Sequence, residues 1–179
     1  MLGAVLAPYA LRTLGLSPLQ FGLATALAGA GGFVGATTTT ARGRRLGTGG
    51  AVITAHLVTT TGVALMALAG LGTADRSAAA VLALGQACHG FGIGFSNSHE
   101  MSYRQALTPD ALQARTNTTM RSFNRAVVVI VAPLGGLLAV QTGNRLALVV
   151  AAVVFGLSAV MLIASPFRRA NTDPKPLGS

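Results

Sequence analysis

Residues Tyr103–Arg121, YRQALTPDALQARTNTTMR, form the longest strongly polar run ahead of the C-terminal tail. Long apolar segments flank this run on both sides. The tripeptide Thr108-Pro109-Asp110 is a strong turn signal, because a proline biases the residue before it away from the helical conformation. Thr108 is a candidate cap for a short helix that ends near Arg115. The run therefore predicts a basic loop, with one short amphipathic helix, between two long apolar helices.

The composition of the chain is typical of a membrane protein. Its 179 residues are 51% hydrophobic and 9% charged, and the mean hydropathy is +0.62. A soluble domain carries about 25% charged residues, because its surface faces water. The single cysteine, Cys88, lies in an apolar run, where we expect it to pack as an inert side chain. The predicted fold class is an all-α membrane protein, and its first partner is the lipid bilayer.

The net charge of +9 does not by itself indicate a nucleic-acid partner. A nucleic-acid-binding surface gathers basic residues on one face with interleaved aromatic side chains. Here the basic residues stand in clusters that separate long uncharged segments. We therefore expect no nucleic-acid partner.

The uncharged segments predict about five transmembrane helices and a partial first helix, since a span needs about 20 apolar residues. Residues 1–11 are too short to span and resemble the last turns of a helix that lacks its beginning, with Pro8 at a kink. Ser17 and Pro18 are predicted as the N-cap and first residue of the second helix. Residues 1–166 form one transmembrane bundle, and residues 167–179 are expected to be a disordered cytoplasmic tail. The expected spans are 1–14 (partial), 17–41, 50–72, 77–101, 119–142 and 145–165.

The loops between these spans alternate in basic content. Cytoplasmic loops of membrane proteins carry an excess of Lys and Arg. One set of loops holds Arg42, Arg44, Arg45, Arg104, Arg115, Arg121, Arg168, Arg169 and Lys175. The alternate set holds Arg12, Arg76 and Arg145. The alternation predicts a multi-pass protein of the cell membrane with its C-terminus in the cytoplasm.

Glycines recur within the apolar segments. Gly31 and Gly35 form a small-xxx-small pair, which allows two helices to approach closely in a bilayer. Gly90, Gly92 and Gly94 give the pattern G-x-G-x-G, but inside an apolar helix with no strand before it. That context does not support a nucleotide site.

Two stretches resemble a known family. Residues 35–47, GATTTTARGRRLG, stand at a predicted cytoplasmic turn and are similar to the loop motif G-x-x-x-D-[RK]-x-G-[RK]-[RK] of the major facilitator superfamily. Gly43, Arg44 and Arg45 match the end of the motif. Ala36, Thr40 and Ala41 replace its Gly, Asp and basic residue, which puts a gating role for this turn in doubt.

The second stretch is RQALTPDALQARTNTTMR with the later APLGGLLA and GNRLAL. It resembles the drug and siderophore exporter branch of that superfamily, of the macrolide-efflux or enterobactin-exporter type. The resemblance covers nearly the whole chain and implies the C-terminal six-helix bundle of a twelve-helix transporter. It further implies a small-molecule substrate held between two bundles, and efflux by an antiporter in which proton entry drives export.

Polar and ionisable residues inside spans are the candidates for a substrate or proton pathway, because each is costly in hydrocarbon. Each has a plainer interpretation. Arg125 is also explained by snorkelling to the interface, and Glu100 by a surface ion pair with Arg104 four residues on. Asn97, His89 and His56 are equally explained by hydrogen bonds between helices.

No nucleophile–base arrangement, metal-ligand spacing or phosphate loop appears in the sequence, so neither an enzyme nor a cofactor is expected. Three functional hypotheses remain open. The chain is part of an efflux transporter that needs a second bundle, or a half-size transporter that dimerises. The third hypothesis is a non-transporting membrane remnant or partner subunit.

Overall fold

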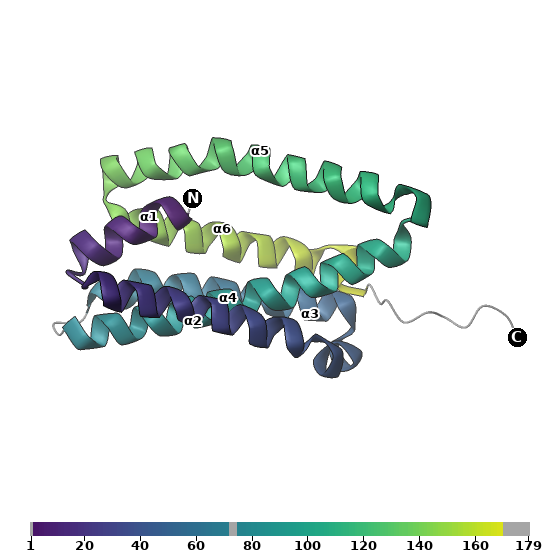
Figure 1. Cartoon of the computed structure of the whole chain (residues 1–179), viewed down its shortest axis with the longest axis horizontal. Helices are drawn as coiled ribbons and strands as arrows, with labels where there is room; N and C mark the ends of the chain where they lie inside the picture. Colours follow the sequence, from purple (N-terminus) through teal and green to yellow (C-terminus); the bar gives the residue numbers. More distant parts are fainter. Residues whose placement is uncertain (1, 72–74, 170–179) are drawn as a thin grey trace, which may run out of the picture.

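The computed structural model describes residues 2–71 and 75–169, without the side chains of residues 40–45, 75 and 76. Every regular element in these ranges is a helix, which confirms the all-α fold class (Figure 1). Five helical segments are long and apolar enough to cross a membrane: Pro18–Thr37, Leu46–Leu71, Ser77–Leu107, Asp110–Thr142 and Asn144–Ala164. The elements in order are α1 (Leu2–Pro8), a π-helical turn (Tyr9–Thr13), α2 (Pro18–Thr37), α3 (Thr39–Leu68), a 3-10 turn (Ala69–Leu71), α4 (Asp75–Leu107), α5 (Asp110–Thr142), α6 (Asn144–Ala164) and a 3-10 turn (Pro166–Arg169).

Helix α4 is the centre of the bundle, because α2 and α3 both pack against it along their length and α6 packs on α3. The close approach depends on glycine. A Cβ atom on Gly90 would lie 1.9 Å from the carbonyl oxygen of Ala28 in α2, and one on Gly92 would lie 2.6 Å from that of Ala55 in α3. The G-x-G-x-G pattern therefore serves helix packing on two faces of α4.

The predicted Gly31 and Gly35 pair lies at the α2–α4 contact, so the packing interpretation of these glycines is confirmed. We expect Gly31→Leu to lower the melting temperature of the purified protein well below that of Gly29→Leu. A Cβ atom on Gly31 would lie 2.2 Å from the Ala87 carbonyl oxygen, whereas one on Gly29 meets nothing within 4 Å. Overpacking of this kind typically costs about 1–3 kcal/mol. Equal melting temperatures for the two variants would show that α2 and α4 are not this close.

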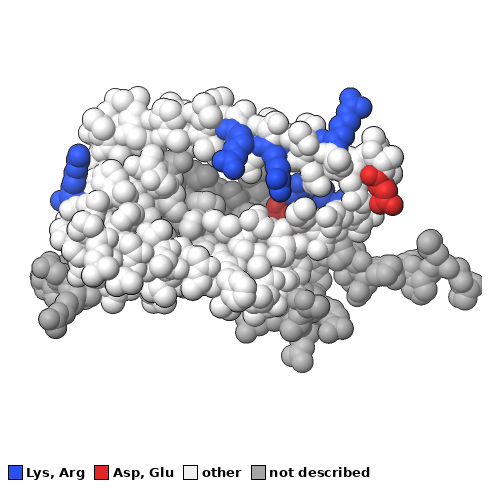
Figure 2. Space-filling model, viewed as in Figure 1, with Lys and Arg blue, Asp and Glu red and all other residues white. Residues whose placement is uncertain are grey.

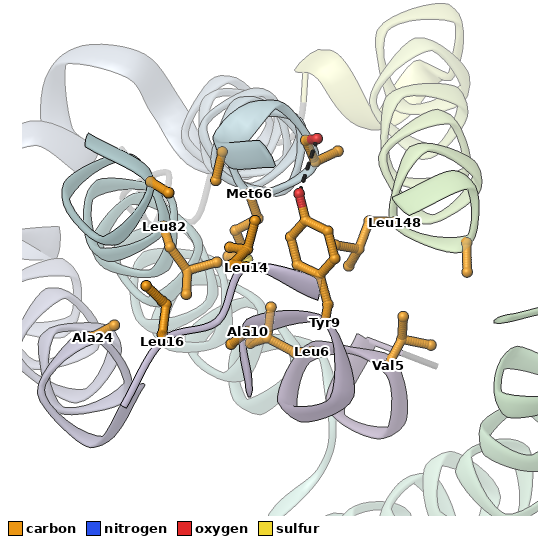
Figure 3. Close-up of a cluster of buried hydrophobic side chains, with 14 residues drawn as sticks. Val5, Leu6, Tyr9, Ala10, Leu14, Leu16, Ala24, Met66, Leu82 and Leu148 are labelled. Carbon is orange, nitrogen blue, oxygen red and sulfur yellow. Dashed lines mark hydrogen bonds between the residues drawn. The ribbon is translucent and has the colours of Figure 1, made fainter. Parts of the chain in front are cut away.

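Tyr9 is the centre of the largest buried cluster (Figure 3). Its side chain is fully buried, and the hydroxyl donates to the Ala67 carbonyl oxygen at 3.3 Å and accepts from the Gly70 amide at 3.2 Å. Arg145 Nε also donates to the Ala67 carbonyl oxygen, at 3.2 Å. These bonds join the N-terminal segment to the ends of α3 and α6, so the turn at Tyr9–Thr13 that follows Pro8 is held in place.

The prediction of a loop over Tyr103–Arg121 is wrong. Helix α4 continues to Leu107, α5 begins at Asp110, and the turn comprises Thr108 and Pro109. The residues on either side are good helix formers, so proline interrupts the helix only locally. Thr108 does not cap α5, because its hydroxyl donates back to the Arg104 carbonyl oxygen at 2.8 Å. The polar stretch is a helical hairpin.

The other predicted boundaries compare as follows. Ser17 caps α2 in a capping box with Gln20, and Pro18 is the first helical residue, as predicted. The expected break before the third helix is a kink inside α3 at Gly47, whose φ of 66° suits glycine. The start of the expected disordered tail is instead helical over Pro166–Arg169. Residues 170–179 lie outside the described part of the chain.

Candidate functional site between α4 and α5

Helix α5 stands apart from the rest of the bundle. All of its residues are described, and Gly135 alone is buried. Its contacts are with α1 and α6, while its first half lies opposite the last half of α4 across a hollow of about 740 Å³. Figure 2 shows this face hollowed below α5, with basic side chains along the rim and an acidic side chain partly visible inside. The hollow is lined by Asn97, Glu100, Met101 and Arg104 of α4 and by Asn117, Met120, Arg121, Phe123, Asn124 and Val127 of α5.

The lining combines polar and apolar side chains from one face of each helix. Positions on α4 and α5 recur three or four residues apart, which is the spacing of one helical face. Each helix has 33 residues and is therefore about 50 Å long, against a hydrocarbon core of roughly 30 Å. The hairpin is therefore longer than the core is thick, and the hollow lies in the part of the hairpin nearer the α4–α5 turn.

The charges in the hollow are Arg104, Arg121 and Glu100, which leave it net positive. The expected ion pair between Glu100 and Arg104 is not formed. The Glu100 carboxylate instead accepts a hydrogen bond from Ser96 one turn earlier. Both guanidinium groups are thus available to a ligand.

The structure brings together two of the five predicted pathway residues, Asn97 and Glu100, in the hollow. His56 lines a second cavity, between α3, α4 and α6, whose lining also includes Glu100. His89 packs edge-on against Phe155 of α6, with ring centroids 5.9 Å apart. Arg125 is exposed and is not among the described residues that line the hollow.

The loop-motif residues Gly43, Arg44 and Arg45 belong to the first turns of α3 by their backbone. Their side chains lie outside the described part of the structure, so the predicted motif has no described side-chain geometry. Within the described residues, no group of three His, Cys, Asp or Glu side chains has the arrangement of a metal site.

The sequence interpretation did not bring Arg104, Arg121, Asn117 and Asn124 together in one hollow, where the structure places them. In the sequence, Arg104 and Arg121 serve as topology signals, and the two asparagines stand in the predicted loop. A signal was present, because Asn117, Arg121 and Asn124 repeat with a helical period. The assumption of a loop at these positions concealed that period.

Long apolar helices with exposed apolar side chains, in a chain this poor in charge, define a multi-pass helical membrane protein. The family model of the Major Facilitator Superfamily matches residues 1–178. The chain therefore belongs to the Major Facilitator Superfamily, and its function is that of a membrane transporter of this type. Comparison with curated proteins and with solved structures gives no match.

Proposed function

We propose that this chain exports a small amphipathic molecule that carries an anionic group. The observation that carries the proposal is the lining of the α4–α5 hollow. Arg104 and Arg121 supply guanidinium groups, which match carboxylate and phosphate groups well. Met101, Met120 and Phe123 supply an apolar wall for the rest of the substrate.

The position of the hollow in the hairpin supports loading from the cytoplasm. Arg104, Arg115 and Arg121 mark the α4–α5 turn as cytoplasmic by the positive-inside rule. A hollow near this end loads its substrate from the cytoplasm. The drug and siderophore exporter branch, suggested by the same stretch of sequence, agrees with loading from this side.

Glu100 is the proposed proton-binding residue that couples transport to the pH gradient. It lines the hollow close to the two arginines, whereas Asp110 lies at the hairpin tip and accepts a hydrogen bond from Gln113 Nε2 at 2.9 Å. Protonation of Glu100 removes the one negative charge among the described lining residues.

A second bundle is the proposed partner. Charged side chains are costly where they face lipid, and the hollow opens beside Phe123, which is 70% exposed. A further bundle, or another copy of this chain, would cover the opening and exclude lipid from it. If the chain is instead a non-transporting membrane remnant, no second bundle is needed over the opening, and no transport is expected.

We expect cysteines placed in the hollow to react from the cytoplasmic side. In a Cys88→Ala background, Met101→Cys and Phe123→Cys should label with a membrane-impermeant maleimide in inside-out vesicles, and much less in right-side-out vesicles. Thr13→Cys, at the other end of the bundle, is the matched control and should show the reverse preference. Labelling of Met101→Cys from the outer side alone would contradict loading from the cytoplasm.

The same variants identify the partner. A short bis-maleimide added to Phe123→Cys vesicles yields a band at twice the mass of the chain if the partner is a second copy. A heterologous band indicates a separate bundle.

A further inference from the structure

A second cavity shares Glu100 with the hollow. It has a volume of about 390 Å³ and is formed where α3, α4, α6 and the turn at Pro166–Arg169 meet. Glu100, His56 and Ser158 contribute polar side chains from three different helices. The rest of the lining is apolar: Val52, Met161, Leu162 and Phe167.

The polar groups of this cavity are all available as hydrogen-bond acceptors. His56 Nδ1 lies 3.0 Å from the Val52 carbonyl oxygen, which cannot donate, so Nδ1 carries a proton. With one proton on the ring, Nε2 has a free lone pair. The Ser158 hydroxyl donates to the Val154 carbonyl oxygen at 3.0 Å, which leaves its lone pairs free. Glu100 accepts from Ser96 through one oxygen and retains the other.

The charge of the cavity is opposite to that of the hollow. Glu100 brings a negative charge, and none of the described lining residues is Lys or Arg. The hollow, by contrast, contains Arg104 and Arg121 in addition to Glu100. An anion is therefore disfavoured in this cavity and a cation is favoured.

The geometry points to a binding site for a primary alkylammonium ion in the cavity between α3, α4 and α6. A primary ammonium group has three N–H donors and no acceptor, which matches three acceptors from three helices. A quaternary ammonium group has the same charge but no donor. The alkyl part of the ligand packs against Met161, Leu162 and Phe167. Such a group occurs on soluble alkylamines and on the headgroup of an aminophospholipid, and either source satisfies this chemistry.

Occupation of the cavity has a consequence for the hollow, and this consequence rests on the proposed function. Glu100 borders both cavities, so an ammonium ion bound to it offsets its negative charge. The hollow then binds an anion more tightly, and by linkage the anion strengthens ammonium binding by the same factor.

The test is the binding of n-octylamine to the purified full chain in phosphatidylcholine nanodiscs, measured by isothermal titration against empty nanodiscs. Charge-assisted hydrogen bonds contribute about 1.5–3 kcal/mol, so Glu100→Gln should weaken binding by roughly ten- to a hundredfold. Ser158→Ala removes a neutral acceptor and should weaken it by about three- to tenfold. Ser158→Ala is a mild change, so it tests the site even where Glu100→Gln fails to fold.

Controls separate this cavity from the hollow. Asn124→Leu alters the hollow alone and should leave octylamine binding unchanged, whereas His56→Leu should weaken it. Octyltrimethylammonium, which has no N–H donor, should bind at least tenfold more weakly than octylamine. Equal binding of the two cations, or equal binding by wild type, Ser158→Ala and His56→Leu, would overturn the proposal. These results do not depend on transport, so a failure here is distinguishable from a failure of the proposed function.

A second lipid composition identifies the source of the amine. In nanodiscs that contain phosphatidylethanolamine, weaker octylamine binding than in phosphatidylcholine shows that the lipid amine competes for the cavity. Equal binding in the two lipids assigns the site to a soluble amine. Absence of specific binding in both lipids contradicts the site.

Discussion

Replacement of Arg104 and Arg121 together by glutamine is expected to reduce transport of an anionic substrate by at least about a hundredfold. Both guanidinium groups line the hollow. A hydrogen bond to a charged group contributes about 1.5–3 kcal/mol, so the loss of two removes most of the binding energy of the anionic group. Initial rates of uptake into inside-out vesicles measure the effect.

Arg115→Gln is the matched control for this pair. Arg115 lies on α5, as Arg121 does, and its side chain is exposed. It is not among the described residues that line the hollow. Its replacement should leave the rate within about twofold of wild type, since surface substitutions change energies by about 0.5 kcal/mol or less. If Arg115→Gln and the double variant lose activity equally, the arginines act through topology and not through the substrate.

Glu100→Gln is expected to abolish stimulation of transport by a pH gradient while substrate exchange continues. Glutamine resembles the protonated carboxyl group in shape and charge, so the variant is held in the proton-loaded form. Because the negative charge is lost, the hollow also binds the anion more tightly. Proteoliposomes with and without an imposed pH gradient separate the driven flux from the exchange flux.

Asp110→Asn is the control for Glu100→Gln. Asp110 is the other acidic residue with a described side chain and lies at the hairpin tip, beside Gln113. Its replacement should leave the response to the pH gradient unchanged. A Glu100→Gln variant that still responds like wild type would exclude Glu100 as the proton-binding residue.

The packing of the bundle could be predicted from the sequence where a local pattern has one meaning. Ser17-Pro18 specifies the start of α2. Gly31 and Gly35 mark a face of α2 that another helix can approach closely, although the pattern does not say which helix. The uncharged segments specify the helices because hydrocarbon requires them. These features are local, so no knowledge of the tertiary structure is needed to interpret them.

The hairpin of α4 and α5 could not be predicted in this way. Polar residues from Tyr103 to Arg121 suit a loop and an exposed helix equally, and hydropathy does not distinguish the two. The hollow requires side chains from two helices, and Asn97 and Glu100 gain their neighbours Arg121 and Asn124 only when the hairpin closes. The second cavity is even harder to predict from the sequence, because two of its lining residues, His56 and Ser158, are far apart in the chain.

The most direct test of transport uses inside-out vesicles from cells that carry the gene in its native place, so that any partner bundle is present. The vesicles receive a mixed pool of amphipathic carboxylates and phosphates together with an imposed pH gradient, and mass spectrometry identifies what accumulates inside. We predict that wild-type vesicles accumulate at least one anion that vesicles with Arg104→Gln and Arg121→Gln do not. Identical profiles in wild-type vesicles and in vesicles without the chain would contradict export through the α4–α5 hollow.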